Sequence, residues 1–337
     1  MISEGRILIE IRPDGAVRLE SNRVANVANL LVSRTAQEAI KLLPLVFSLC
    51  AHAHVMAAKG ALNLPVSEQD RQLVLAENAR EHLLRILMGW KVDNAPPLPP
   101  APVMSLLSEV EKGTAIATLK TYLQVHIFGL SLDEFLKFSA QDIKQWLAQS
   151  TTLPALYLAQ LANKNWQSLG AAPLRFLPQM PIKILRERLD EPDFALMPDW
   201  NGKPCETGSL ARQSTHPIVL KALEEFGAGL FTRHLARLVE LAQTPKQMAT
   251  PQTSQKGVQK GVVETARGRL VHVAKVTDNK ITKYAILAPT EWNFHPKGIA
   301  MQSLSALRAL DKSTLAMQAR AVVEAIDPCV DFDVRVA

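Results

Sequence analysis

The sequence has few cysteines, no signal-peptide pattern and no long apolar run. Its three cysteines, Cys50, Cys205 and Cys329, form an odd and sparse set, which argues against a disulfide framework and for a reducing compartment. The longest apolar run, residues 42–58, contains Pro44 and two histidines, so it is too short and too polar to span a bilayer. We therefore expect a cytoplasmic protein without membrane insertion.

A block of charge of one sign is also missing. The net charge is +6, from 38 Lys and Arg against 32 Asp and Glu, but the basic residues are scattered and often have acidic neighbours. Nucleic-acid-binding surfaces concentrate Lys and Arg on one face or along one helix, so we expect no nucleic-acid partner. A mildly basic surface is compatible with acidic protein partners.

The periodicity of apolar residues predicts a mainly α (α+β) protein in a single domain over residues 1–337. Alternating apolar residues predict two small antiparallel β units, at about 6–20 and 262–287. Residues 93–103 are typical of a Pro-rich linker, and residues 244–261 of a mobile polar segment. Helical spacing, which begins near Thr35, predicts further helices over 67–90, 104–126, 132–148, 153–163, 217–226, 230–243 and 312–325.

Six short motifs follow one another along the chain. In order they are Glu4-Gly5; Cys50-x-x-x-His54; Asn201-Gly202-Lys203-Pro204 with Gly208-Ser209-Leu210-Ala211-Arg212; Glu264-Thr265-Ala266-Arg267-Gly268-Arg269-Leu270-Val271-His272; Pro289-Thr290-Glu291-Trp292-Asn293; and Asp327-Pro328-Cys329. Together they resemble the large subunit of nickel-iron hydrogenases, and more closely its shortened, non-catalytic relatives, the HupK/HoxV-type hydrogenase assembly proteins. The resemblance runs nearly end to end and implies a long-helix bundle like a trimmed hydrogenase large subunit.

The chain departs from the catalytic pattern of that family at three positions. The catalytic proteins use two cysteine pairs, whose four thiolates bind nickel and bridge it to iron. Here Phe47 and Phe332 replace one cysteine of each pair, and Arg335 replaces the closing histidine. The two remaining cysteines cannot build a soft four-thiolate nickel site. The resemblance therefore implies a non-catalytic assembly factor that is not an enzyme and holds no nickel.

The same resemblance implies roles for the residues that are kept. Cys50 and Cys329 are expected to hold an Fe(CN)2(CO) unit transiently, with Arg267 donating hydrogen bonds to the cyanide nitrogens. His54 is expected to donate to a thiolate or a diatomic ligand, and Glu4 to orient Cys329. The expected partners are HypC/HypD-type maturation chaperones and the hydrogenase large-subunit precursor.

Other interpretations of these residues stay open. Cys50 is compatible with a small buried hydrophobe, and Arg267 with a salt bridge in the core. A zinc site built from Cys50, His54, Cys329 and a fourth group is a further alternative, although paired cysteine spacing is absent. The alternative function is a metal-free chaperone that binds the hydrogenase precursor or its maturation chaperones. Cys205 matches no ligand position of the family, and we expect it to be structural or exposed.

Overall fold

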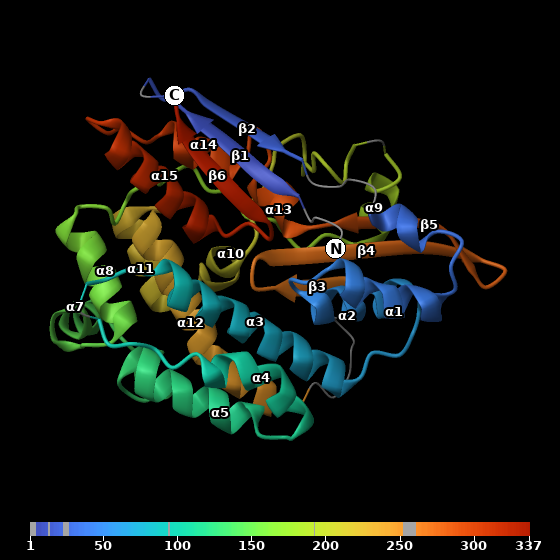
Figure 1. The fold of residues 1–337 in the computed structure, drawn as a ribbon, viewed down its shortest axis with the longest axis horizontal. Coiled ribbons are helices and arrows are strands. Elements are labelled where there is room, and N and C mark those ends of the chain that lie inside the picture. The colour runs from blue at the N-terminus through green and yellow to red at the C-terminus, as the bar shows by residue number, and fades with distance from the viewer. Residues whose placement is uncertain (1–4, 13, 23–26, 94, 192, 252–260) are drawn as a thin grey trace. The chain divides into compact units, whose positions relative to one another are not determined.

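The structure is a computed structural model that describes residues 5–12, 14–22, 27–93, 95–191, 193–251 and 261–337. The chain divides into two compact units, whose elements are labelled in Figure 1. The first unit consists of Met1–Val74, Pro173–Gly208 and Thr253–Ala337, and the second of Leu75–Ala172 and Ser209–Gln252.

Strands from both ends of the chain form one sheet of the first unit, in the order β2-β1-β6 (Figure 1). β1 (Arg6–Ile11) and β2 (Val17–Ser21) form the predicted antiparallel hairpin. β6 (Asp331–Val336) lies parallel to β1, with Phe332 opposite Ile7. The first predicted β unit is therefore a mixed sheet and not a purely antiparallel one. The sequence did not predict β6 as the parallel partner of β1, because the two strands are far apart in the chain and no tight turn connects them. The sheet anchors the C-terminal tail that follows Cys329.

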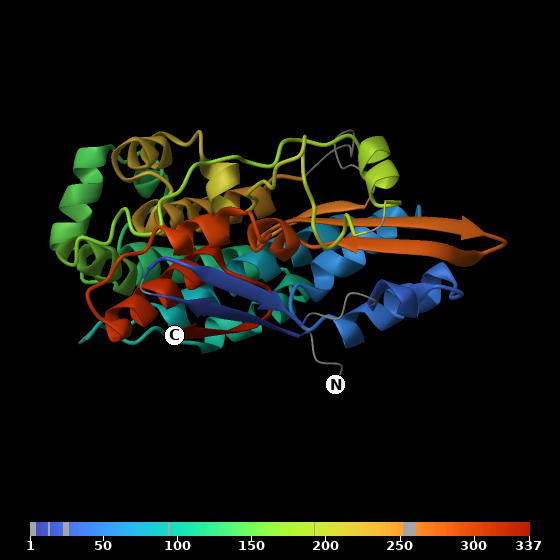
Figure 2. The ribbon, with the colours of Figure 1, turned by 90° about the horizontal axis from the view of Figure 1, so that it is seen from above.

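The second sheet of this unit is antiparallel, with the order β3-β4-β5, as predicted. Its strands are β3 (Val262–Thr265), β4 (Gly268–Thr277) and β5 (Lys280–Leu287). Asp278 and Asn279 form the tight turn between β4 and β5, and both have positive φ angles, of 49° and 59°, as hairpin turns of this length favour. The turn end of this hairpin projects away from the rest of the unit (Figure 2).

Helices α1 (Ala36–Val46) and α2 (Ala51–Ala61) come before the site in the chain. Thr35 begins α1 with a capping box that includes Glu38, in which each side chain satisfies a backbone N–H of the first turn. Pro44 lies inside the last part of α1, so the break between the two helices falls at residues 47–50 rather than at the proline. Helix α2 packs against β3 and β4.

Shorter helices complete the first unit. Helices α14 and α15 pack against each other, and α15 contacts β6 while α14 contacts β2. The bounds are η1 (Val27–Leu31), α9 (Ile182–Arg188), α13 (Pro289–Asn293), α14 (Ile299–Ser305) and α15 (Lys312–Ile326).

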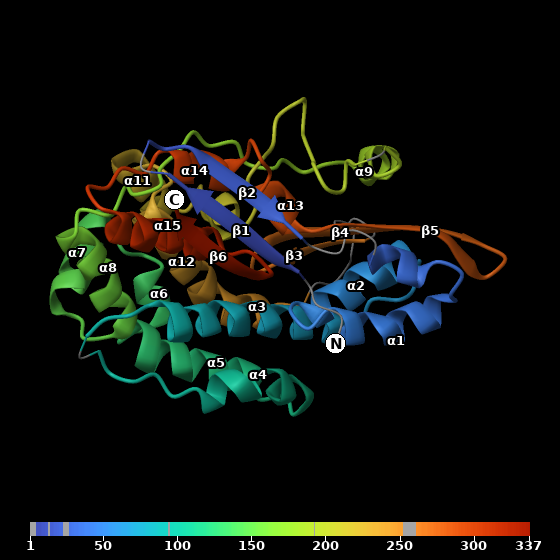
Figure 3. The same ribbon diagram turned by 45° about the horizontal axis from the view of Figure 1, so that its top comes forward.

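The second unit is a helix bundle around α12 (Leu230–Ala249), whose residues are mostly buried (Figure 3). Helix α3 (Glu68–Gly89) begins in the first unit and continues into the second. The other elements are α4 (Ala101–Glu111), α5 (Ala115–Tyr122), η2 (Leu123–Phe128), α6 (Leu132–Phe135), α7 (Ala140–Gln149), α8 (Leu153–Asn163), α10 (Ser209–Gln213) and α11 (Pro217–Phe226).

The bounds of several predicted helices differ in this bundle. The helix expected over 132–148 is broken at residues 136–139 into α6 and α7. The helix expected over 104–126 begins at Ala101, inside the expected Pro-rich linker, and is broken at Gly113, which has a φ of +73°. Helix α12 continues to Ala249, beyond the expected end at residue 243. Residues 252–260 of the expected mobile segment lie outside the described part of the chain.

The structure confirms the predicted fold class, a mainly α protein with two small β units. None of the helices in the described residues has both the length and the apolar character needed to cross a membrane.

Candidate functional site

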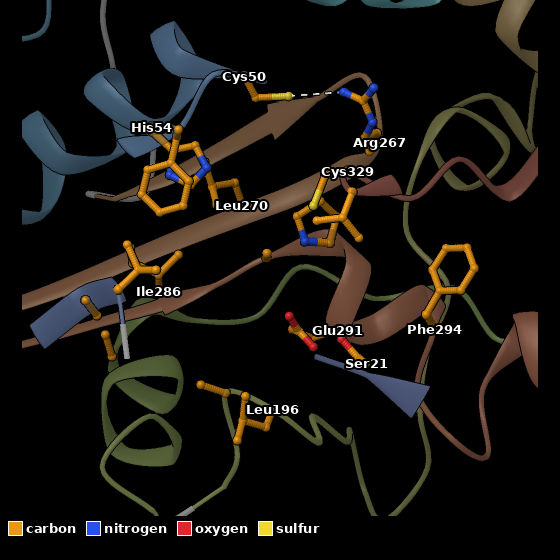
Figure 4. A pocket seen from close by; sticks show the side chains of 18 of the residues that line it. Ser21, Cys50, His54, Leu196, Arg267, Leu270, Ile286, Glu291, Phe294 and Cys329 are labelled. Atoms are coloured by element: carbon orange, nitrogen blue, oxygen red, sulfur yellow. Dashed lines mark hydrogen bonds between the residues drawn. The ribbon is translucent and has the colours of Figure 1, made fainter. Parts of the chain in front are cut away.

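A cavity of about 720 Å³ opens in the first unit, and four of the predicted site residues line it. In Figure 4, Cys50, His54, Arg267 and Cys329 occupy one side of this pocket, and Leu196 and Glu291 the other. These four residues come from α2, from the turn between β3 and β4, and from the segment before β6. The fold thus brings together side chains that are more than 200 positions apart in the sequence.

Cys50 is held in an unusual backbone conformation at the start of α2. Its φ and ψ angles are 57° and 34°, in the left-handed region, which non-glycine residues adopt at a cost of order 1 kcal/mol. Its carbonyl oxygen accepts the backbone N–H of His54 at 3.0 Å, the first hydrogen bond of the helix. The side chain is buried, packs in a core cluster with Ala53 and Leu270, and also lines the cavity.

Arg267 connects the two cysteine motifs. Its Nη1 donates to the sulfur of Cys50 at 3.4 Å, and its Nε donates to the carbonyl oxygen of Pro328 at 3.3 Å. The same Nε lies 3.4 Å from a carboxylate oxygen of Asp327, and both side chains are almost fully buried. The salt bridge that we considered as an alternative for Arg267 is therefore present, together with the contact to the cysteine.

Cys329 is positioned by Thr290, in the first turn of α13. The Thr290 hydroxyl donates to the cysteine sulfur at 2.9 Å and accepts the backbone N–H of Cys329 at 3.1 Å. Thr290 is 3% exposed, so this hydroxyl has little competition from water. It fixes both the backbone and the side chain of Cys329.

His54 belongs to a chain of buried polar side chains in the cavity wall. Its ring stacks on Phe47, with centroids 3.7 Å apart and planes within 5°. Its Nδ1 lies 3.0 Å from Nε2 of His272, whose Nδ1 lies 2.8 Å from the hydroxyl of Tyr284. Burial lowers the pKa of His272 to about 3 and raises the pKa of Tyr284, so both groups are neutral near pH 7.

The residues at the altered positions of the family pattern lie in different surroundings. Phe47 lines the cavity and stacks on His54. Phe332 instead stands in β6, where the guanidinium of Arg320 lies 5.3 Å from its ring centroid. Arg335 lies in the same strand and pairs with Asp333 at 2.9 Å. Glu4 lies outside the described residues.

Across the described ranges, no three His, Cys, Asp or Glu side chains are grouped so that they could hold a metal ion. Cys205 packs in a core cluster with Trp292 and is 2% exposed, and burial raises the pKa of its thiol, so of the two expected placements it is buried rather than exposed.

The end of the third motif, Ser209 to Arg212, contributes to a separate ionic network in the second unit. Glu240 accepts a hydrogen bond from Arg212 Nε at 2.6 Å and one from His82 Nε2 at 3.2 Å. The hydroxyl of Ser209 donates to the same carboxylate. Burial alone would raise the pKa of Glu240, but the charge of Arg212 and the hydrogen bond from His82 outweigh it and hold this pKa well below its usual range.

Sequence reasoning did not single out Thr290, Asp327, His272 or Tyr284. The first three stand inside the six motifs. For Asp327 the available signal was a carboxylate two positions before Cys329, a proposed ligand. Tyr284 lies in β5 outside every motif. Its contact with His272 depends on the register in which β4 pairs with β5. The sequence pattern predicts the hairpin but not this register.

Comparison with known proteins gives consistent matches. Residues 209–334 match the nickel-dependent hydrogenase family. The chain is 29% identical to the hydrogenase expression/formation protein HupV of Azotobacter chroococcum, over 98% of each chain. It is 28% identical to HupK of Azotobacter vinelandii, again over 98% of each chain. It is also 28% identical to HoxV of Cupriavidus necator, over 98% of this chain and 95% of that one.

Solved structures show the same fold. The Ni-Fe-Se hydrogenase of D. vulgaris Hildenborough aligns with a TM-score of 0.57 and 16% identity, over 97% of this chain and 94% of that one. The enzyme of Desulfomicrobium baculatum aligns with the same TM-score and 15% identity, over 98% and 95%. Together these matches confirm the resemblance to the nickel-iron hydrogenase large-subunit superfamily and to its expression/formation proteins.

Proposed function

We propose that this chain, which resembles hydrogenase expression/formation proteins over 98% of its length, is a hydrogenase maturation scaffold that transiently holds or relays an Fe(CN)2(CO) unit. Cys50 and Cys329 bind the iron. The unit arrives from HypC/HypD-type chaperones and leaves for the hydrogenase large-subunit precursor. The observation that carries the proposal is that one cysteine of each motif lines a common cavity, with Arg267 in contact with both segments.

The chemistry of the cavity wall fits this cargo. Thiolates are the protein ligands that soft metal centres prefer, and binding of a metal to two thiols releases their protons. The guanidinium of Arg267 is a planar donor that cannot lose its charge, and it suits the nitrogen ends of two cyanides. An iron that already carries three diatomic ligands needs few ligands from the protein, so a pair of cysteines suffices.

The residues at the lost positions support carriage rather than hydrogen turnover. Phe47 presents an apolar ring to the cavity where a nickel-binding thiolate would be required. Phe332 stands in a strand, paired with β1. Because nickel in this family requires four thiolates, the chain acts as a non-catalytic assembly factor.

Infrared spectroscopy tests the proposal directly. Protein purified without oxygen from cells that make hydrogenase is expected to show cyanide and carbonyl stretching bands. These bands should disappear in Cys50→Ala and in Cys329→Ala. Cys205→Ala is the matched control, because this third cysteine packs in the core away from the cavity lining, and it should keep the bands. Wild-type protein without bands would overturn the proposal.

A metal-free chaperone is the second candidate, and one observation favours it. Both sulfurs already receive hydrogen bonds from the protein, Cys50 from Arg267 and Cys329 from Thr290. Neither cysteine therefore needs a metal to satisfy its sulfur. This function predicts that the Cys50→Ala/Cys329→Ala double variant still supports hydrogenase maturation in cells, whereas the iron-relay function predicts that maturation stops.

A further inference from the structure

Tyr284, His272 and His54 form a continuous hydrogen-bonded chain that ends at the cavity. The three side chains are 5%, 0% and 7% exposed, and the two contacts between them measure 2.8 and 3.0 Å. A neutral imidazole carries one hydrogen, so one of its nitrogens donates and the other accepts. The chain can therefore exist in only two arrangements, which run in opposite directions.

The hydroxyl of Tyr284 decides between the two directions. Its bond to His272 is the only hydrogen bond of this hydroxyl within the described residues. Burial raises the pKa of Tyr284, so the phenol keeps its hydrogen, and a buried hydroxyl hydrogen without an acceptor costs about 1–3 kcal/mol. The lone pair of a neutral imidazole nitrogen is also far more basic than a phenol oxygen. The tyrosine therefore donates to Nδ1 of His272.

The remaining hydrogens follow from that first step. His272 accepts at Nδ1, so its hydrogen is on Nε2 and is donated to Nδ1 of His54. His54 accepts at Nδ1, so its own hydrogen is on Nε2. Stacking on Phe47 fixes the plane of the His54 ring.

We propose that Tyr284 and His272 are positioning residues that lock His54 in its Nε2–H tautomer, which makes His54 a hydrogen-bond donor at the cavity and not a metal ligand. A histidine binds a metal through an unprotonated ring nitrogen. In this tautomer the unprotonated nitrogen of His54 is Nδ1, and it accepts the hydrogen bond from His272. His54 and Arg267 then both present hydrogen-bond donors to the cavity, which suit ligands that carry acceptor atoms. If the proposed function holds, these acceptors are the diatomic ligands of the iron unit.

Nitrogen NMR of the protein labelled with 15N-histidine tests the tautomer without any iron. The chain has eight histidines, and the His54 and His272 signals are assigned by their loss in His54→Gln and His272→Gln. Near pH 7 we expect both rings to be neutral with the hydrogen on Nε2. A His54 ring with its hydrogen on Nδ1 would overturn the proposal, whatever the behaviour of the variants.

Tyr284→Phe tests whether the hydroxyl of Tyr284 determines the tautomer of His54. Removal of the hydroxyl leaves Nδ1 of His272 without a donor, so the two arrangements of the hydrogen bonds become similar in energy. His54 then exchanges between its two tautomers, and the chemical shifts of its two nitrogens should approach each other. Tyr122→Phe is the matched control, since its hydroxyl is also buried but has no hydrogen-bond partner among the described residues. It should leave the His54 signals unchanged. An unchanged His54 spectrum in Tyr284→Phe would also overturn the lock.

Infrared spectra separate this inference from the proposed function. In protein loaded with the iron unit, Tyr284→Phe is expected to shift the cyanide or carbonyl bands, because the hydrogen bond from His54 weakens, without removing them. Bands that keep their wild-type positions would overturn the assignment of the diatomic ligands as acceptors. Wild-type protein without bands would defeat the proposed function, while the NMR result would still decide the tautomer.

Discussion

The hydroxyl of Thr290 lies 2.9 Å from the sulfur of Cys329 and 3.1 Å from the backbone nitrogen of the same cysteine. It acts as donor in the first contact and as acceptor in the second, so one side chain uses both of its hydrogen-bonding capacities on one residue. Because only Val330 separates Cys329 from β6, Thr290 also fixes the point from which the tail enters the sheet.

Thr290→Val keeps the shape of the side chain and removes both hydrogen bonds to Cys329. We expect a loss of about 1–2 kcal/mol in the free energy of unfolding and faster reaction of Cys329 with a thiol reagent. Urea unfolding and labelling rates measure the two effects. Thr282→Val is the control, because its hydroxyl makes one exposed hydrogen bond to Lys275. Equal behaviour of the two variants would contradict the role of Thr290.

Gly268→Ala should disturb the turn that presents Arg267. Gly268 has a φ of +133°, and a Cβ atom there would lie 2.5 Å from Cγ2 of Thr207. Backbone strain and overlap together should cost about 3 kcal/mol. Gly113→Ala, at a φ of +73° with no atom of the described residues within 4 Å of the added carbon, has strain without overlap and should cost roughly 1 kcal/mol. Thermal unfolding of both variants provides the comparison.

The buried His272 should make stability depend on pH. Its pKa is about 3 in the folded protein, because of burial, against an ordinary value of 6.5. Below pH 6.5 the unfolded chain binds a proton that the folded protein does not, so stability falls as the pH falls from about 6.5 towards 3, by up to about 1.4 kcal/mol per unit. His272→Gln should show a shallower slope in urea unfolding between pH 7.5 and 5. An unchanged slope would contradict this assignment.

Glu240→Ala should destabilise the second unit. The change leaves Arg212 and His82 without their shared carboxylate, and we expect a loss of roughly 3 kcal/mol. Glu224 pairs with Lys221 at 2.9 Å on the surface, where both side chains are more than half exposed. Glu224→Ala should therefore change the free energy of unfolding by less than about 0.5 kcal/mol. Urea denaturation of the two variants checks the difference, and similar losses would sink the argument.

Local signals in the sequence predicted several elements closely. Helices α8 and α11 have the expected bounds, because proline in the first turn and apolar spacing are both local properties. The β4–β5 hairpin was predicted from its turn residues for the same reason. The break at Gly113 and the extension of α12 through Pro245 were missed, since packing around these residues outweighs their intrinsic preferences.

The sequence by itself determined which residues are candidates for the site: Cys50, His54, Arg267 and Cys329 stand in ordered motifs, and Phe47 and Phe332 mark the lost cysteines. Only the tertiary structure decided what each of them touches. The contact of Arg267 with Cys50, the clamp of Thr290 on Cys329 and the chain from Tyr284 to His54 all join distant segments. Such contacts depend on strand pairing and helix packing across the whole unit, and no local pattern of residues encodes them.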